Sequence, residues 1–299
     1  MNRKQRRAAV KQSPPAGLNR SGDPASQLFA EAEQLQRQNK FDEAARAYKR
    51  LLLLKPDHAK ASNNLGLVLL AQGKRGEASA YFARALTLMP QLFEQYSGIC
   101  QTLAAVSPPI GEAMRRALAA WPNRLTADQL LDSAGQAAIC QDPLLLCMLR
   151  SVPARNTALE LVLTALRAAL LADTGNVSDD RALAFCCALA TQCFINEYVF
   201  ATTPDEEAQI ERVKGALGDA LLSGDEIAPI QLAVLATYAP LHALAGADAL
   251  SSHEWPPALD EVVTQQLREP RQELALRSTI APLTSIDDAV SLRVQRQYE

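Results

Sequence analysis

Paired carboxylates are the residues of this sequence best suited to acid–base chemistry. They occur in three clusters, Asp179-Asp180, Asp205-Glu206-Glu207 and Asp287-Asp288. General acid–base catalysis needs two such groups that are buried and differ in pKa. Each cluster instead begins a segment with helical periodicity, where acidic side chains interact favourably with the helix dipole. We therefore expect these carboxylates to stabilise helix N-termini.

Cysteine and histidine are the candidate nucleophiles and metal ligands. The six cysteines include no C-x-x-C pair, and His58, His242 and His253 lie far from any cysteine in the sequence. The adjacent Cys186 and Cys187 would point in different directions from a helix. The basic N-terminus lacks the apolar segment of a signal peptide. The sequence therefore predicts reduced core cysteines in a cytoplasmic protein, without a metal site or a catalytic constellation.

Glycine-rich phosphate-binding loops do not occur in the sequence. Its 13 glycines form no Gly-x-Gly and no Gly-Lys-Ser/Thr pattern. Such loops bind anions through closely spaced backbone N–H groups at the start of a helix. We therefore predict no nucleotide-type cofactor and no enzymatic activity for these residues.

The elements that would position any site are predicted to be helices. Hydrophobic residues make up 48% of the 299 residues, charged residues 21% and aromatic residues only 5%. Alanine and leucine dominate, which favours close helix packing, whereas residues preferred in strands are scarce. The composition predicts an all-α protein of one to three domains.

Two consecutive segments repeat with a period of 34 residues from Ala25 onward. Five positions with special residues coincide in the two copies: Ala32 and Gly66, Leu35 and Leu69, Ala44 and Ala78, Tyr48 and Phe82, Pro56 and Pro90. The small residues allow two helices to approach closely, the aromatic ring fills the space beside them, and the proline ends the second helix. The pattern resembles the tetratricopeptide repeat, which implies helical hairpins stacked into a solenoid.

Weaker copies continue the pattern as far as residue 153. Asp23-Pro24, Thr126 with Gln129, and Asp142-Pro143 predict helix starts in this region. We expect a disordered basic arm at 1–22, repeats and degenerate repeats at 23–153, and a further helical domain at 154–299. In that last domain we expect helices at 158–172, 180–201, from 204, at 259–277 and 287–299, and a buried hairpin at 228–250.

The concave groove of the stacked hairpins is the predicted ligand surface. Its walls would come from the first helix of each pair, through Phe29, Glu33, Arg37, Lys60, Asn63, Asn64 and Leu67. In the resembled repeat family an asparagine at the place of Asn64 commonly contacts a bound peptide backbone. Ala30 and Ile99 take the corresponding positions in the neighbouring units, so only one amide is available. Asn64 as a solvated polar residue is the alternative.

The C-terminal third carries a second resemblance. The segments concerned are Phe194–Phe200, Leu235–Leu241, Trp255-Pro256, Glu269-Pro270, Ile286–Ser291 and Val294–Glu299. Together with the repeats they resemble bacterial proteins in which tetratricopeptide repeats precede an S-adenosylmethionine-dependent methyltransferase domain. In that family the glycine-rich cofactor loop follows the stretch that corresponds to Gln297–Glu299. The resemblance implies a helical, non-catalytic region that stops short of that domain, as a fragment, a truncated protein or a split gene product.

Charge and hydropathy argue against nucleic-acid and membrane partners. Residues 1–20 carry six basic side chains and no acidic one, whereas the rest carries 24 basic and 33 acidic side chains. A short basic arm without aromatic residues on an acidic body is a poor nucleic-acid binder. The uncharged stretch 227–247 contains Pro229 and Pro240, which favour a buried helix pair over a membrane span.

Three functions remain open from the sequence. The first is a protein-interaction scaffold that binds a protein or peptide in its groove and presents it to an associated methyltransferase domain. The second is a subunit or fragment of a methyltransferase that contains such repeats. The third is a purely structural oligomerisation domain, with an oligomeric state that the sequence does not indicate.

Overall fold

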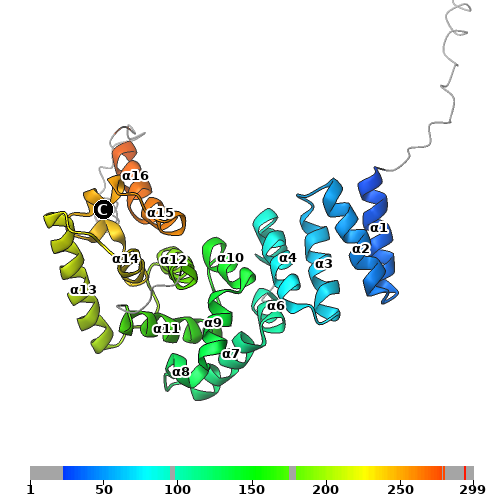
Figure 1. Cartoon of the computed structure of the whole chain (residues 1–299), viewed down its shortest axis with the longest axis horizontal. Helices are drawn as coiled ribbons and strands as arrows, with labels where there is room; N and C mark the ends of the chain where they lie inside the picture. Colours follow the sequence, from blue (N-terminus) through cyan, green and yellow to red (C-terminus); the bar gives the residue numbers. More distant parts are fainter. Residues whose placement is uncertain (1–22, 95–97, 175–179, 278, 280–292, 294–299) are drawn as a thin grey trace, which may run out of the picture.

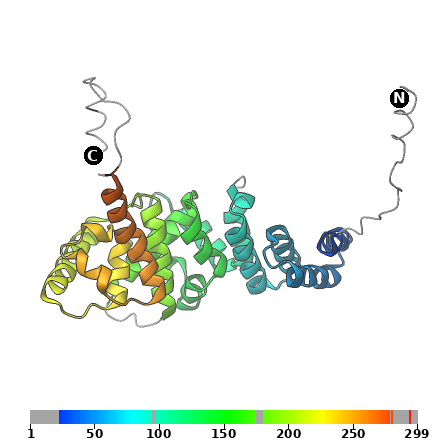
Figure 2. The same cartoon turned by 90° about the horizontal axis from the view of Figure 1, so that it is seen from above.

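The structure is a computed structural model that describes residues 23–94, 98–174 and 180–277, together with 279 and 293. All regular elements of these residues are helices, arranged in an elongated row with α1 and α16 at opposite ends (Figure 1). The view from above shows the same extended arrangement (Figure 2). The all-α prediction is confirmed. The predicted arm at 1–22 and the predicted helix at 287–299 lie outside the described residues, apart from residue 293.

Two helical hairpins form the N-terminal end of the row. Their helices are α1 (Pro24–Arg37), α2 (Phe41–Leu54), α3 (Ala59–Ala71) and α4 (Arg75–Leu88). Each hairpin turns through one residue with a positive φ, Asn39 at 58° and Gly73 at 75°, which are 34 positions apart. Glycine and asparagine are the residues that adopt this left-handed conformation most readily. The two copies of the repeat therefore share their turn geometry as well as their helices.

The small residues of the repeat allow the close helix contact that the sequence predicts. A Cβ atom added to Gly66 on α3 would lie 2.9 Å from Cε1 of Phe82 on α4. Phe82 and the equivalent Tyr48 are both fully buried, as is Ala32. Because protein interiors are close-packed, the aromatic ring occupies the volume that a side chain at position 66 would need.

Six shorter helices follow, and they depart from the regular repeat. They are α5 (Gln91–Glu94), α6 (Gly98–Val106), α7 (Pro108–Ala120), α8 (Ala127–Leu130), α9 (Ser133–Cys140) and α10 (Pro143–Ser151). α6 and α7 form a hairpin, but α10 packs extensively against α4 (Figure 1). The Ser79 hydroxyl on α4 donates to the carboxylate of Asp142 at 2.9 Å and accepts from the N–H of Leu144 at 3.1 Å. A buried polar contact thus joins α4 to the start of α10.

Within the described residues, the C-terminal part contains six α-helices of 7 to 20 residues. They are α11 (Thr157–Ala172), α12 (Asp180–Ile195), α13 (Pro204–Ser223), α14 (Pro229–Ala236), α15 (Pro257–Val263) and α16 (Glu269–Arg277). The short turns η1 (Leu241–Ala243) and η2 (Ala247–Ser252) are 3₁₀-helical, and η3 (Thr264–Arg268) is a π-helical turn between α15 and α16. The continuous helix predicted at 259–277 is therefore present with one wider turn.

Two predictions for this part differ in detail from the structure. The helix expected at 180–201 ends at Ile195, because Glu197 and Tyr198 adopt positive φ angles of 56° and 58° that end the helix. The hairpin expected at 228–250 has α14 as its first half, but 3₁₀ turns replace a second α-helix. Among the described residues no helix has the length and apolar character needed to cross a membrane.

The buried side chains form two hydrophobic clusters that meet along α11 and α12. Leu163 and Phe185 belong to the first cluster, which extends back to α1. Leu171 and Cys187 belong to the second, which contains α13, α14 and α15. The first cluster runs through residue 153 without interruption. The boundary between the two hydrophobic clusters thus lies within α11 and α12. The predicted domain boundary between residues 153 and 154 stays a prediction.

Candidate peptide-binding groove

The predicted groove residues lie on α1 and α3, the first helices of the two hairpins. Arg37, Lys60 and Leu67 are exposed, whereas Glu33 and Asn63 are half-buried. Leu67 exposes 44% of its surface. The side chains of Arg37, Lys60 and Leu67 are therefore accessible to a binding partner.

Asn64 is held in place by a hydrogen-bond chain that crosses from α3 to α1. Its amide Nδ2 donates to the Tyr48 hydroxyl at 3.1 Å, and this hydroxyl donates to Oε1 of Gln36 at 2.8 Å. The Asn63 amide approaches Oδ1 of Asn64 at 3.5 Å. An asparagine amide has two N–H donors and an oxygen that accepts twice. The chain therefore orients Asn64 while leaving one donor and acceptor capacity for a ligand.

The Tyr48 hydroxyl is the central group of this hydrogen-bond chain. Burial raises the pKa of Tyr48 to about 12, the hydrogen bond from Asn64 opposes this, and the charges of Glu33 and Arg37 act on it in opposite directions. The phenol therefore stays protonated at neutral pH and can donate to Gln36. Of the predicted groove residues, Asn64 is hydrogen-bonded to this hydroxyl, whereas Glu33 and Arg37 act on it through their charges alone.

Phe29, another predicted groove residue, is half-buried and contacts two other rings. Its ring lies edge-on to Tyr48 with centroids 6.1 Å apart and stacks on His58 at 4.9 Å. Nδ1 of His58 accepts from the N–H of Ala61 and caps α3. Phe29 thus fixes the relative position of α1 and α3 at the end of the groove.

Tyr48 and Gln36 are the groove residues that sequence reasoning missed. The repeat pattern places Tyr48 in the core only, as the counterpart of Phe82. The difference between the two residues is one hydroxyl, and a buried tyrosine hydroxyl normally needs a hydrogen-bond partner. A tyrosine where the other copy has phenylalanine was therefore the signal for a polar group at the groove.

The predicted acidic clusters lie at helix N-termini where the structure describes them. Glu206 forms a capping box with Thr203 at the start of α13, and Asp205 and Glu207 are exposed in its first turn. Asp180 lies in the first turn of α12. Asp179, Asp287 and Asp288 fall outside the described residues. The helix-start interpretation holds for the described members.

The cysteines are free thiols and mostly part of the core. Cys186, Cys187 and Cys193 are buried, and burial raises the pKa of Cys187 and of Cys193 to about 12. In the described part of the chain no group of three or more histidine, cysteine or acidic side chains could hold a metal ion. Thiols with raised pKa are poor nucleophiles at neutral pH.

Comparison with known proteins identifies the repeats. Residues 29–92 match the tetratricopeptide repeat family model. The chain is also similar to "Protein O-mannosyl-transferase TMTC1" of Homo sapiens and of Mus musculus, with 40% identity over 63 residues in each case. These matches cover 21% of this chain and 7% of the length of each relative. No solved structure matches the chain significantly.

The matched region contains the candidate groove. It includes every predicted groove residue, from Phe29 to Leu67, and all of α2, α3 and α4. Tetratricopeptide repeats indicate a protein–protein interaction scaffold, so this part of the chain is of a non-catalytic, binding type.

Proposed function

We propose that the groove formed by α1 and α3 binds an extended segment of a protein partner. The observation that carries this proposal is the orientation of Asn64 by Tyr48 and Gln36. An amide fixed in this way can donate to and accept from a peptide backbone without losing further side-chain entropy. Lys60 and Leu67, both exposed on α3, would add one charged and one apolar contact beside it.

The test begins with random peptides, because the groove chemistry defines a class of ligand rather than one sequence. A phage-displayed library of random 12-residue peptides is selected on the full chain, and the enriched peptides are measured by fluorescence anisotropy. We expect Asn64→Ala to weaken binding about tenfold, because a buried hydrogen bond contributes about 1–1.5 kcal/mol. Arg46→Ala, on the exposed face of α2, is the matched control and should leave binding unchanged.

A second variant separates orientation from contact. Tyr48→Phe gives the first repeat the residue that the second repeat already has at Phe82, so folding should be preserved. It removes the hydroxyl that holds Asn64, and we expect severalfold weaker binding, less than the loss in Asn64→Ala. Peptides that bind both variants as tightly as they bind the wild-type chain would contradict the proposal.

We further propose that residues 154–299 connect this scaffold to an S-adenosylmethionine-dependent methyltransferase domain, in the same chain or in a partner. The support is the resemblance of residues 190–299 to proteins with that architecture. The chain by itself should then show no heat of binding with S-adenosylmethionine in calorimetry. A methyltransferase domain encoded directly downstream would support the proposal, and saturable cofactor binding by this chain would favour the alternative of a methyltransferase subunit or fragment.

The third hypothesis, an oligomerisation domain at 154–299, is tested by a different measurement. Leu274 and Leu276 on α16 are 65% and 52% exposed, and they are among the exposed apolar residues of this region that a second copy could cover. Light scattering of the full chain at high concentration decides this question. A monodisperse monomer would exclude the oligomerisation hypothesis and leave the scaffold proposal intact.

A further inference from the structure

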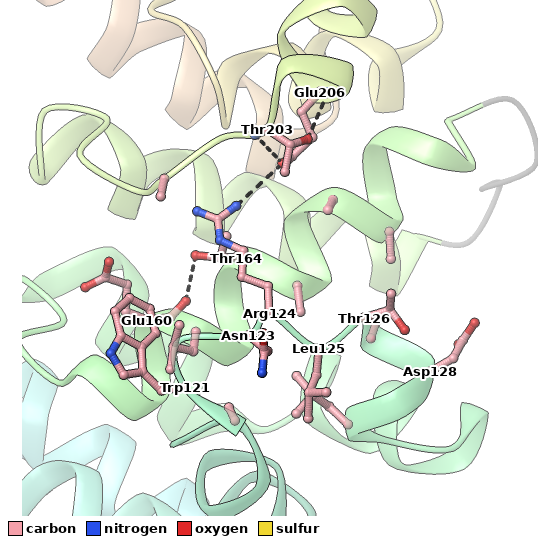
Figure 3. A pocket seen from close by; sticks show the side chains of 18 of the residues that line it. Trp121, Asn123, Arg124, Leu125, Thr126, Asp128, Glu160, Thr164, Thr203 and Glu206 are labelled. Carbon is pink, nitrogen blue, oxygen red and sulfur yellow. Dashed lines mark hydrogen bonds and ion pairs between the residues drawn. The ribbon is translucent and has the colours of Figure 1, made fainter. Parts of the chain in front are cut away.

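A cavity of about 590 Å³ lies between the segment that follows α7 and the helices α11 and α13 (Figure 3). Its walls are the residues from Trp121 to Asp128, one face of α11, and the start of α13 at Thr203 and Glu206. A volume of this size lies in the range of about 300–1,000 Å³ typical of ligand pockets. The cavity contains none of the groove residues on α1 and α3.

The floor of the cavity is apolar and has short side chains, because α11 contributes alanine residues to it. They are Ala165, Ala168, Ala169 and Ala172. An aliphatic chain can lie along such a surface without displacing any side chain. The floor therefore suits the methylene stem of a long side chain.

The charges around the cavity are predominantly negative. The carboxylates of Glu160, Asp128 and Glu206 line it, and Arg124 is the one cation among its described lining residues. Arg124 forms an ion pair with Glu206 at 3.9 Å. Glu206 also accepts from the N–H of Thr203 and from the Tyr238 hydroxyl, both at 2.8 Å. The charge of Arg124 is thus balanced, and two carboxylates remain to attract a cation.

Glu160 and Trp121 lie at the same end of the cavity, whereas Asp128 lies at the other (Figure 3). Glu160 is half-buried on α11, and no cation of the described residues lies within 4.0 Å of its carboxylate. Trp121 exposes 58% of its surface. An exposed indole and a carboxylate that line the same end of a cavity make a favourable environment for an organic cation.

We propose that this cavity binds a lysine or arginine side chain of a protein partner. The head group contacts the indole of Trp121 and the carboxylate of Glu160, and the stem lies along the alanine face of α11. A small inorganic cation would not use the aromatic ring or the apolar floor, and an anion would meet two uncompensated carboxylates. The site is independent of the groove on α1 and α3 and adds a second contact area to the same scaffold.

The experiment uses the full chain and a defined probe, an acetylated and amidated hexapeptide of alternating alanine and arginine. The matched control peptide has citrulline, the uncharged isostere of arginine, at the same positions. Binding is followed by tryptophan fluorescence in a Trp255→Phe background, so that Trp121 is the reporter, and by calorimetry. Trp255 is 9% exposed, donates to the carbonyl of Leu250 and does not line the cavity, so its replacement leaves the lining residues unchanged.

We expect the arginine peptide to change the emission of Trp121 and the citrulline peptide to bind at least tenfold more weakly. Glu160→Gln should weaken binding of the arginine peptide about tenfold, and Trp121→Ala about three- to tenfold in calorimetry. Glu226→Gln, an exposed carboxylate outside the cavity, is the control and should bind like the wild-type chain. Asn64→Ala should also bind like the wild type, which separates this proposal from the groove.

The chain's own basic segment carries the same kind of charge as the probe and is tested in the same series. A variant with Arg3, Lys4, Arg6 and Arg7 replaced by glutamine should bind the probe at least as tightly as the wild type. Tighter binding by this variant, lost again on adding Glu160→Gln, would support the site and identify residues 1–22 as its occupant. Equal binding of the arginine and citrulline peptides, or no binding by either chain, would overturn the proposal.

Discussion

Replacing Gly66 by alanine should destabilise the second hairpin, although alanine is the better helix former. Gly66 lies in the interior of α3, where the change from glycine to alanine alone would stabilise by about 1 kcal/mol. The new Cβ would lie 2.9 Å from Cε1 and 3.0 Å from Cδ1 and Cζ of Phe82. Ordinary carbon contacts lie at about 3.5–4.0 Å, so either the ring or the helix must move.

The size of the free-energy cost depends on how little space surrounds the Phe82 ring. Phe82 is only 1% exposed, and overpacking in a closed interior costs about 1–3 kcal/mol. The matched control is Gly215→Ala in α13, where no atom lies within 4 Å of the added Cβ. That variant should gain the helix-propensity term alone. The two variants should therefore differ by about 1–3 kcal/mol in their effect on stability.

Hydrogen exchange read by mass spectrometry reports the local stability of α3 and α4, and urea unfolding read by circular dichroism reports the whole chain. The amides of α3 should exchange up to about 30-fold faster in Gly66→Ala than in Gly215→Ala, because the gain in helix propensity in α3 offsets about 1 kcal/mol of the overpacking cost. Adding Phe82→Leu to Gly66→Ala should cost less than Phe82→Leu alone, because the smaller side chain relieves the contact. Equal or greater protection of α3 in Gly66→Ala would refute the packing argument.

Three further predictions concern the core. Ser79→Ala removes a buried partner of the Asp142 carboxylate and should destabilise by about 1–3 kcal/mol, seen as faster exchange in α10 but not in α1. Arg167→Met should lower the melting temperature by several degrees, because the buried guanidinium donates to the carbonyls of three residues; an unchanged transition would show that water replaces it. The thiols of Cys187 and Cys193 have a pKa of about 12 in the folded chain and ionise near 8.5 in the unfolded chain. The free energy of unfolding should therefore be constant up to about pH 8. Above that pH it should fall by up to about 1.4 kcal/mol per pH unit for each thiol. The urea midpoint at pH 8, 9 and 10 checks this, and replacing both cysteines with alanine should make the fall less steep.

Local signals predicted the helix starts well. The side chains of Asp23, Thr126, Asp142 and Thr203 each accept a backbone N–H of the first helical turn, as the sequence indicates. Capping depends on residues within three or four positions of one another, so it can be read from a short segment. The 34-residue period made the two hairpins predictable as well, because the same special residues recur at equivalent positions in both copies.

Contacts between distant segments could not be predicted. Nothing near Ser79 indicates that its partner is Asp142, because the two residues are 63 positions apart in the sequence. The cavity depends in the same way on Trp121 and Glu160, which lie on different elements and carry no shared motif. Such pairs are fixed by the path of the chain between them, and one sequence does not contain that information.

The packing of α10 against α4 has a consequence for synthesis of the chain. Ser79 and Asp142 are 63 residues apart, and translation at about 5–20 residues per second separates their appearance by about 3–13 s. During this interval the side of α4 that α10 later covers has no partner from its own chain. The second hairpin therefore completes its core only after α10 has been made. A nascent chain stopped before residue 143 would present that side to chaperones and to other unfinished chains.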